Sequence, residues 1–362
     1  MTTMQRVPVI IFGAGRVGRA LVQQLVESRE LHRRRDGLDL QVVAWCDRDG
    51  ALVDDDGLGP EALRAAGTLK EGGARLAETP LGYRQDDLMA IVDVAGTDGC
   101  VVADVTATGE TVPALELALQ RGYGAATANK VPLSGPQETF DRLTGSGRFR
   151  YESTVGSAVP VIEATLGLLR AADRVDAVRG ALSGTLGFLF TGLQAGGLFS
   201  VLVAEALQRG YTEPDPRADL GGLDVARKAL ILARTLGWRL ELRDVELESL
   251  VPPALADLPL HEFMARLAEL DAEFAARVAA AGGQGHVLRY VAEIAGGHVR
   301  VGRQAVAADS PIGRLRGTDN LVAFHTRYYP DEPLVLQGRG AGVDAAAAGV
   351  HADIVALAKC RL

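Results

Sequence analysis

The feature that most constrains this sequence is a glycine-rich turn between a strand pattern and a helix pattern, close to the start of the chain. Residues 7–12 are apolar and mostly β-branched, which is typical of a buried strand and too short for a helix. The GxGxxG motif of residues 13–18 follows directly, and apolar residues at helical spacing continue from it. This order predicts a Rossmann-type, doubly wound parallel sheet that binds a dinucleotide. The alternative is a tight glycine turn in another kind of α/β protein.

Each position of the motif has an expected task. Gly13 permits the tight turn, Gly15 lets the backbone approach a pyrophosphate, and Gly18 lets helix and strand pack closely. The free N–H groups at the start of the helix would bind the phosphates. The predicted cofactor-binding residues of this turn are therefore Gly13, Ala14, Gly15, Arg16, Val17 and Gly18.

The second predicted strand, residues 40–46, ends at an acidic residue, Asp47. A carboxylate at this place usually accepts the ribose hydroxyls and disfavours a 2′-phosphate, which favours NAD weakly. Arg48 lies beside it and could instead pair with a 2′-phosphate, so the choice between NAD and NADP stays open. The spacing from the glycine motif is longer than usual, and the polar stretch 28–39 is predicted to be a loop insertion.

Polar residues also follow two later strand patterns. Residues 100–105 lead into Thr106, and residues 124–128 lead into Lys130. The carboxyl ends of strands in a doubly wound sheet face the ligand crevice, so both residues are site candidates. A solvated loop lysine is the alternative for Lys130.

From residue 148 the pattern changes to strands separated by longer helices, which predicts a second, α+β domain with an open mixed sheet. The predicted strands are residues 149–152, 175–182, 287–294, 298–306, 321–328 and 334–338. The predicted helices are residues 162–169, 201–209, 223–236 and 260–280. The expected domains are residues 1–150 for the dinucleotide, 151–335 for substrate binding and dimerisation, and a segment 336–362 that returns to the first domain.

The densest chemistry lies in residues 210–228, where prolines and paired glycines form a rigid loop rich in carboxylates. The loop leads into a helix predicted to be buried on most sides. Asp224 and Lys228 lie four residues apart on one face of this helix. They form either a structural ion pair or a catalytic dyad, since a desolvated lysine can act in proton transfer.

Glycines return near the end of the chain, at positions 338, 340, 342 and 349. They suggest backbone close to a ligand or a second phosphate contact, and a plain linker before a docking helix is the alternative.

Charge and composition limit the kinds of partner and compartment that we expect for this chain. The formal net charge of −8 gives no electrostatic support for binding nucleic acid or an anionic membrane. No stretch approaches a membrane span and no signal-peptide pattern begins the chain, so we expect a cytoplasmic protein. Cys46, Cys100 and Cys360 are expected to be buried, unpaired thiols in a reducing compartment. The scattered histidines show no metal-ligand spacing.

With these motifs together, the chain resembles homoserine dehydrogenase nearly from end to end. The most specific stretch is Gly210-Tyr-Thr-Glu-Pro-Asp-Pro-Arg217 with Leu223-Asp-Val-Ala-Arg-Lys228, and Thr127-Ala-Asn-Lys130 and Ser183-Gly-Thr185 support it. The chain is most similar to the short, plant- and fungal-like type without a C-terminal regulatory module. The resemblance implies NAD(P)-dependent interconversion of L-aspartate 4-semialdehyde and L-homoserine, in threonine and methionine biosynthesis.

The resemblance also implies residue roles. Lys228 would be the general acid/base, Asp224 its partner, and Lys130 a strand-end lysine near nicotinamide and substrate. Glu213 would bind the substrate ammonium. The other implied substrate-binding residues are Asp219, Gly210, Tyr211 and Thr212. The further implied cofactor contacts are Thr106, Lys130 and Gly342. Similar enzymes bind Na⁺ or K⁺ through backbone carbonyls, here those of Glu152, Val155, Ser157 and Val159. A homodimer is implied as well.

Two other functions are compatible with parts of the sequence. One is a related two-domain dehydrogenase that acts on a different amino-acid semialdehyde or amino acid. The other is a non-catalytic dinucleotide-binding protein, which would be expected to lack Glu213, Asp224 or Lys228. All three are present.

Overall fold

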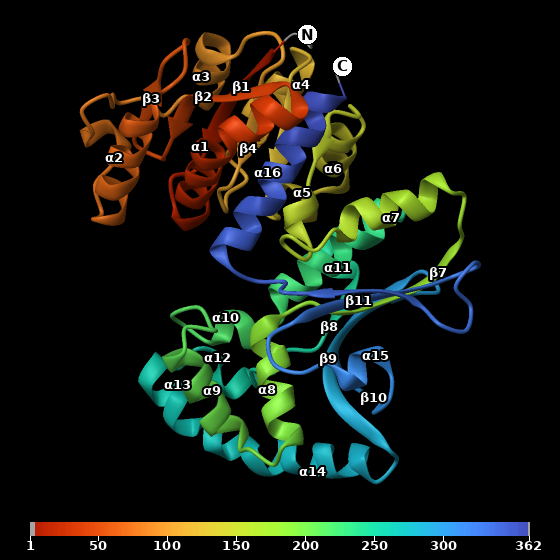
Figure 1. Ribbon diagram of the computed structural model, residues 1–362. Helices are drawn as coiled ribbons and strands as arrows, with labels where there is room; N and C mark the ends of the chain where they lie inside the picture. The colour runs from red at the N-terminus through yellow and green to blue at the C-terminus, as the bar shows by residue number, and fades with distance from the viewer. Residues whose placement is uncertain (1–3, 361–362) are drawn as a thin grey trace. The chain divides into compact units, whose positions relative to one another are not determined.

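The computed structural model describes residues 4–360, which form two compact units (Figure 1). The first comprises residues 4–158 and 342–360, and the second is Val159–Ala341. The domain boundaries predicted from the sequence, at residues 150 and 335, fall slightly earlier along the chain. Each unit is built around its own six-stranded sheet.

The sheet of the first unit has the order β3-β2-β1-β4-β5-β6. All neighbours pair in parallel except β3, which is antiparallel to β2. The strands are β1 (Gln5–Phe12), β2 (Leu38–Cys46), β3 (Ala51–Val53), β4 (Val101–Asp104), β5 (Gly124–Thr127) and β6 (Phe149–Arg150). This is the predicted doubly wound fold, and the apolar runs form strands because helices cover both faces of such a sheet. The strand predicted over 149–152 is shorter, since a 3₁₀ turn begins at Glu152.

Helices α1 and α16 pack against each other in this unit. The apolar side chains of α16 Ala347, Val350 and Ile354 join the core formed by β1, β2 and α1. The helices are α1 (Arg16–Asp36), α2 (Pro60–Glu71), α3 (Leu88–Ala95), α4 (Val112–Gln120), α5 (Val131–Ser134), α6 (Gln137–Thr144) and α16 (Val343–Lys359). Short 3₁₀ turns are η1 (Leu76–Glu78) and η2 (Glu152–Thr154).

The prediction that residues 28–39 form a loop insertion is wrong. Helix α1 continues through them to Asp36 and ends at Gly37, whose φ of 68° is the left-handed conformation of a helix C-cap. Ion pairs between side chains one helical turn apart, such as Arg34 with Glu30, stabilise this polar part. The long spacing between the glycine motif and β2 is therefore additional helix.

The sheet of the second unit has the order β12-β11-β7-β9-β10-β8. Its pairs are antiparallel except β10 with β8, which is parallel, so the predicted mixed sheet is confirmed. The strands are β7 (Val175–Ala181), β8 (Val245–Leu247), β9 (His286–Ala295), β10 (His298–Ala307), β11 (Asn320–Thr326) and β12 (Leu334–Gly338). Helices α8, α11 and α14 pack against β9, and α11 also packs against β10.

The helices of the second unit include one that was predicted as a single element and is interrupted. The predicted helix 260–280 is divided into α13, the 3₁₀ segment η4 (Leu267–Leu270) and α14. The full set is α7 (Val161–Arg170), α8 (Gly184–Gln194), α9 (Phe199–Gln208), α10 (Arg217–Leu220), α11 (Leu223–Thr235), α12 (Pro253–Ala256), α13 (Leu260–Arg266), α14 (Asp271–Gly282) and α15 (Pro311–Arg314). The 3₁₀ turn η3 (Leu242–Asp244) precedes β8.

The prediction about the cysteines can be compared with the structure. Cys46 and Cys100 are buried as expected, but Cys360 is exposed, because it follows the last turn of α16. Within residues 4–360, no helix is long and apolar enough to cross a membrane. The same residues contain no cluster of three or more histidine, cysteine or acidic side chains that could hold a metal ion.

Candidate active site

The glycine turn of the first unit has the geometry of a phosphate-binding loop. Gly13 has a φ of +107°, which L side chains rarely adopt. A Cβ at Gly18 would lie 2.0 Å from the carbonyl oxygen of Gly13, so only glycine allows the first turn of α1 to approach the loop. A Cβ at Gly15 would meet no heavy atom of the described residues within 4 Å. Gly15 is the N-cap of α1, so the loop offers backbone N–H groups to an anion.

The Asp47 carboxylate is occupied by partners within its own unit. Oδ1 accepts hydrogen bonds from the N–H groups of Asp49 and Gly50, at 3.0 and 2.9 Å. Oδ2 accepts from Lys70 Nζ at 2.8 Å and from the Leu76 N–H at 2.9 Å. The four donors fill the usual capacity of a carboxylate. Burial raises the pKa of Asp47, but the ion pair with Lys70 and the backbone hydrogen bonds outweigh it and hold the pKa below its ordinary value.

Arg48 is in the opposite situation. Its side chain is 89% exposed, and its ion pair with Asp49 is long, at 4.0 Å. Arg48 also lines a crevice of about 790 Å³ at the carboxyl ends of β1, β2 and β4. Gly13 and Thr106, both predicted cofactor contacts, line the same crevice. The structure therefore brings these three residues together.

A buried network holds the loops after β4 and β5. The carboxylate of Asp104, at the end of β4, is fully buried and accepts hydrogen bonds from Thr106, Thr111 and Asn129. The Thr106 hydroxyl donates to Asp104 at 2.7 Å and accepts from Asn129 at 3.1 Å. Burial raises the pKa of Asp104, and these hydrogen bonds oppose the shift. Lys130 follows Asn129 and caps the short helix α5, so the network fixes the backbone around both candidates.

In the second unit, Lys228 lies on the buried helix α11. Its Nζ forms an ion pair with Asp224 Oδ2 at 2.8 Å and donates to the carbonyl oxygen of Leu182 at 2.8 Å. The Lys228 side chain is 11% exposed, whereas that of Asp224 is 54% exposed. Described residues thus engage two of the three ammonium donors of a nearly buried lysine. Asp224 and Lys228, the pair predicted from the sequence, are therefore in direct contact.

The loop that precedes α11 gathers the predicted substrate residues. Asp219 Oδ2 accepts a hydrogen bond from the Glu213 N–H at 2.8 Å, and Asp219 Oδ1 lies 3.0 Å from the Thr185 hydroxyl. The Thr185 hydroxyl also contacts the carbonyl oxygen of Tyr211. Burial raises the pKa of Asp219, the hydrogen bonds from the Glu213 N–H and the Thr185 hydroxyl oppose this shift, and the charges of Glu213 and Asp224 add to it. The hydrogen bond from its N–H fixes the backbone of Glu213 against Asp219, and Glu213 itself is exposed.

The start of α11 depends on a glycine. Gly222, its N-cap, has a φ of +73°, and a Cβ there would lie 2.1 Å from the hydroxyl of Tyr290. Tyr290 in turn donates to the carbonyl oxygen of Glu248. Gly210 likewise has a positive φ, of +68°, where the chain turns out of α9. Both glycines are required by the backbone path that leads to Lys228.

The remaining predicted residues lie where the chain passes between units. Gly342, the N-cap of α16, has a φ of +127° and a ψ of +143°, a conformation almost restricted to glycine. Among the carbonyls implied as cation ligands, that of Glu152 accepts from the Val155 N–H at 3.3 Å. The carbonyl of Val159 accepts from the Val161 N–H at 2.8 Å. Both carbonyls thus accept a backbone hydrogen bond from within the chain.

Sequence reasoning overlooked the residues that position the candidates. Asp104 interrupts an apolar strand, and this buried-strand aspartate was the available signal. Asn129 and Thr185 lie in the motifs 127–130 and 183–185 that support the family resemblance, but no role was predicted for either residue. The carbonyl of Leu182 carries no side-chain signal.

Comparison with known proteins gives a consistent result. Residues 160–355 match the family model described as homoserine dehydrogenase. A bifunctional aspartokinase/homoserine dehydrogenase of Haemophilus influenzae is 36% identical over 355 residues, covering 96% of this chain and 42% of that protein. A homoserine dehydrogenase of Emericella nidulans is 42% identical over 255 residues, covering 66% of this chain and 69% of that protein. The chain thus spans about two fifths of the length of the bifunctional relative.

The fold has a solved counterpart. A hyperthermophilic archaeal homoserine dehydrogenase, a mutant in complex with NADPH, superposes with a TM-score of 0.77 at 23% identity, covering 99% of each chain. This likeness shows the fold alone. The family model and the identity to the Emericella nidulans protein show the family. The chain belongs to the homoserine dehydrogenase family, a family of NAD(P)-dependent oxidoreductases.

Proposed function

We propose that this chain catalyses the NAD(P)-dependent interconversion of L-aspartate 4-semialdehyde and L-homoserine, with Lys228 as the general acid/base. The observation that carries the proposal is the nearly buried Lys228, held 2.8 Å from both Asp224 and the Leu182 carbonyl. Reduction of an aldehyde needs a hydride at carbon and a proton at oxygen. When bound, the dinucleotide supplies the hydride, and the third N–H of Lys228 supplies the proton.

The roles of the surrounding side chains follow from this chemistry. Asp224 keeps the ammonium oriented and returns a proton to Lys228 from solvent, which its exposure allows. Glu213 would bind the substrate ammonium, and the hydrogen bond to Asp219 fixes its backbone. Lys130, Gly210, Tyr211 and Thr212 remain proposed contacts. The product would serve threonine and methionine biosynthesis.

We infer that the preferred cofactor is NADP(H). The four hydrogen bonds that Asp47 already accepts leave it poorly suited to bind ribose hydroxyls. Arg48 is exposed and lines the crevice, so its guanidinium can pair with a 2′-phosphate. The archaeal homoserine dehydrogenase described above is in complex with NADPH, which supports the same choice.

A steady-state assay tests both statements. We expect homoserine to reduce NADP⁺ faster than NAD⁺, and L-serine or L-threonine to give no comparable rate. Arg48→Gln should lower kcat/KM for NADP⁺ by about tenfold, the loss of one charge-assisted hydrogen bond, and leave the rate with NAD⁺ nearly unchanged. Arg142→Gln, which removes an ion pair with Glu116 in the same unit, is the matched control. Equal losses with both dinucleotides would contradict the role of Arg48.

Three further assignments belong to the proposal. A Na⁺ or K⁺ ion held by the carbonyls of Glu152, Val155, Ser157 and Val159 would make activity depend on the monovalent cation present. A homodimer formed through the sheet of the second unit would appear as twice the chain mass in light scattering. A cytoplasmic location would fit the three cysteines, none of which forms a disulfide in the part of the chain that the structure describes.

A further inference from the structure

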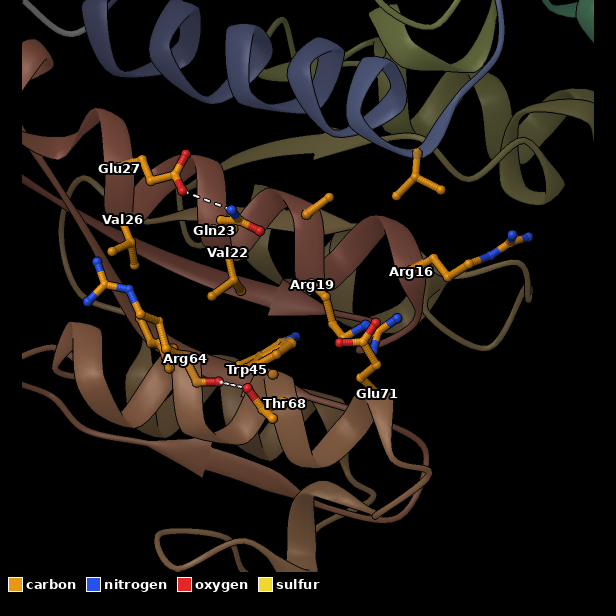
Figure 2. A pocket seen from close by; sticks show the side chains of 14 residues that line it. Arg16, Arg19, Val22, Gln23, Val26, Glu27, Trp45, Arg64, Thr68 and Glu71 are labelled. Atoms are coloured by element: carbon orange, nitrogen blue, oxygen red, sulfur yellow. Dashed lines mark hydrogen bonds between the residues drawn. The ribbon is translucent and has the colours of Figure 1, made fainter.

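A groove separate from the dinucleotide crevice lies between helices α1 and α2 (Figure 2). Its volume is about 500 Å³, within the range of small-molecule sites. Arg16, Arg19, Gln23 and Glu27 line it from α1, while residues 63–71 of α2 line the other side. The crevice that holds Arg48 and Thr106 is lined by different residues, so the two cavities are distinct, although Arg16 also belongs to the predicted cofactor-binding turn.

The groove has an apolar base. Trp45 of β2 lies between the two helices and is fully buried, and Val22 and Leu63, which also line the groove, are buried as well. Gly67, in the interior of α2, faces this tryptophan, and a Cβ there would meet only the Trp45 ring, at the ordinary distance of 3.9 Å. Glycine costs helix stability at such a position, and here no steric contact demands it. Its effect is to leave the groove without a side chain at this turn of α2.

The rim carries arginines that lack carboxylate partners. Among residues 4–360, Arg16, Arg19 and Arg64 form no ion pair, and Arg19 Nη1 is buried without a hydrogen-bond acceptor. The other arginines of α1 are all paired with carboxylates; they are Arg29, Arg33, Arg34 and Arg35. A buried guanidinium nitrogen without an acceptor is costly, so a ligand that supplies one would be stabilised there.

The charge balance of the groove favours an anion. Two glutamates share the lining with the three arginines, and Glu27 is held by a hydrogen bond from Gln23 at 2.8 Å. Figure 2 shows Arg19 and Glu71 at one end of the groove and Glu27 with Arg64 at the other. The lining is therefore net positive in a chain whose formal net charge is −8.

We propose that this groove binds an organic anion, an apolar body carrying a carboxylate, sulfonate or phosphate, independently of the dinucleotide. The apolar body would lie beside Val26 and Gly67, and the anionic group would accept from the guanidinium of Arg19. Since α1 begins in the phosphate-binding loop, the groove adjoins the helix that positions the cofactor phosphates.

The test uses the fluorescent anion 8-anilinonaphthalene-1-sulfonate as the probe, titrated into the full chain with and without saturating NADP⁺. We expect one dye per chain to remain bound when NADP⁺ is present. Arg19→Gln should weaken dye binding by roughly tenfold, the usual effect of losing a hydrogen bond to a charged group. Gly67→Leu should abolish binding by filling the groove without removing a charge. Arg34→Gln, on the exposed part of α1, is the matched control and should leave binding unchanged.

Several results would overturn the proposal. Equal dye affinity in Arg19→Gln and Arg34→Gln would show that the groove arginines are not involved. Complete displacement by NADP⁺ would place the dye in the crevice. A dye affinity that falls as protein concentration rises would assign the groove to a second copy of the chain. Because Arg19→Gln adds no bulk, it decides the question even if Gly67→Leu does not fold. The dye measurements stay interpretable whatever the outcome of the homoserine assay.

Discussion

At the scale of single residues, the chemistry of the second unit depends on a lysine that is both nearly buried and fixed. Lys228 contacts Asp224 through the ion pair that its position one turn along α11 allows, and Leu182 through a carbonyl far away in sequence. The sequence could predict the first contact from the spacing of four residues. It could not predict the second, because a backbone carbonyl has no residue type. That contact decides where Nζ lies.

Replacement of Lys228 tests its role directly. Lys228→Ala should lower kcat by a factor of about 10² to 10⁴, the range expected when a general acid/base is removed. Lys228→Met keeps much of the side-chain volume and should lose the same activity. Dinucleotide affinity, measured by fluorescence titration, and the thermal midpoint of the methionine variant should stay close to those of the unmodified chain. Turnover within a few fold of normal in either variant would reject Lys228 as the proton donor.

Glu213 is expected to affect binding rather than the chemical step. It is exposed, and its backbone N–H is held by Asp219, so its side chain can be removed with little effect on the loop. Glu213→Ala should raise KM for homoserine by roughly tenfold, the loss of one charge-assisted contact, with a smaller change in kcat. Initial rates over a range of homoserine concentrations separate the two constants. An unchanged KM would count against the ammonium-binding role.

At the scale of elements, helix α1 shows how tertiary packing overrides a local pattern. Residues 28–36 are polar enough to suggest a loop, yet they are helical because α16 packs against them. In this interface His32 Nε2 lies 3.0 Å from His351 Nε2, and His32 Nδ1 lies 2.7 Å from Asp36. Ser28 Oγ is 3.3 Å from the same nitrogen of His351. A contact between residues 319 positions apart cannot be read from local spacing.

This histidine pair makes a pH dependence predictable. Burial, with a smaller contribution from His32, lowers the pKa of His351 from 6.5 to about 4. The folded state therefore resists protonation of His351, so its stabilising contribution is present above pH 6.5 and is lost as pH falls toward 4. The full loss is about 3 kcal/mol of unfolding free energy, at up to ~1.4 kcal/mol per pH unit.

Denaturant unfolding at a series of pH values between neutrality and mild acid measures this loss. His351→Gln retains a hydrogen-bond donor toward His32 but cannot titrate, so its unfolding free energy should change less steeply with pH. His298→Gln, at an exposed position, is the matched control and should keep the normal slope. The same slope in all three proteins would show that His351 is not responsible.

At the scale of the whole molecule, the chain's last helix completes its first unit. The buried side chains of α16 belong to the core that β1, β2 and α1 form; they are Ala347, Val350, Ile354, Leu357 and Ala358. The Glu152 N–H donates to Asp353, and the Ser153 hydroxyl donates to the Ala346 carbonyl. Burying the larger of these side chains contributes about 1.5 to 3 kcal/mol each. The sum is comparable with the total stability of an ordinary domain.

A chain that ends at residue 341 should therefore lose the fold of the first unit and keep that of the second. Limited proteolysis followed by mass spectrometry should find cleavage within residues 4–158 and protection of residues 159–341. Dinucleotide binding should be lost. A chain that ends at residue 359 keeps the whole of α16 and serves as the control. Full protection of residues 4–158 in the shorter chain would contradict this account.

The sequence by itself determined the two kinds of sheet, the phosphate-binding turn and the lysine–aspartate spacing, because each depends on local period, glycine conformation or helix geometry. It also supplied the family. Tertiary structure decided what distant residues do to one another. Only there does Asp47 appear saturated by Lys70 and three backbone N–H groups, and only there do unpaired arginines of α1 and α2 line one groove. The physical reason is that hydrogen-bond saturation and charge pairing depend on neighbours in space, which a linear pattern does not specify.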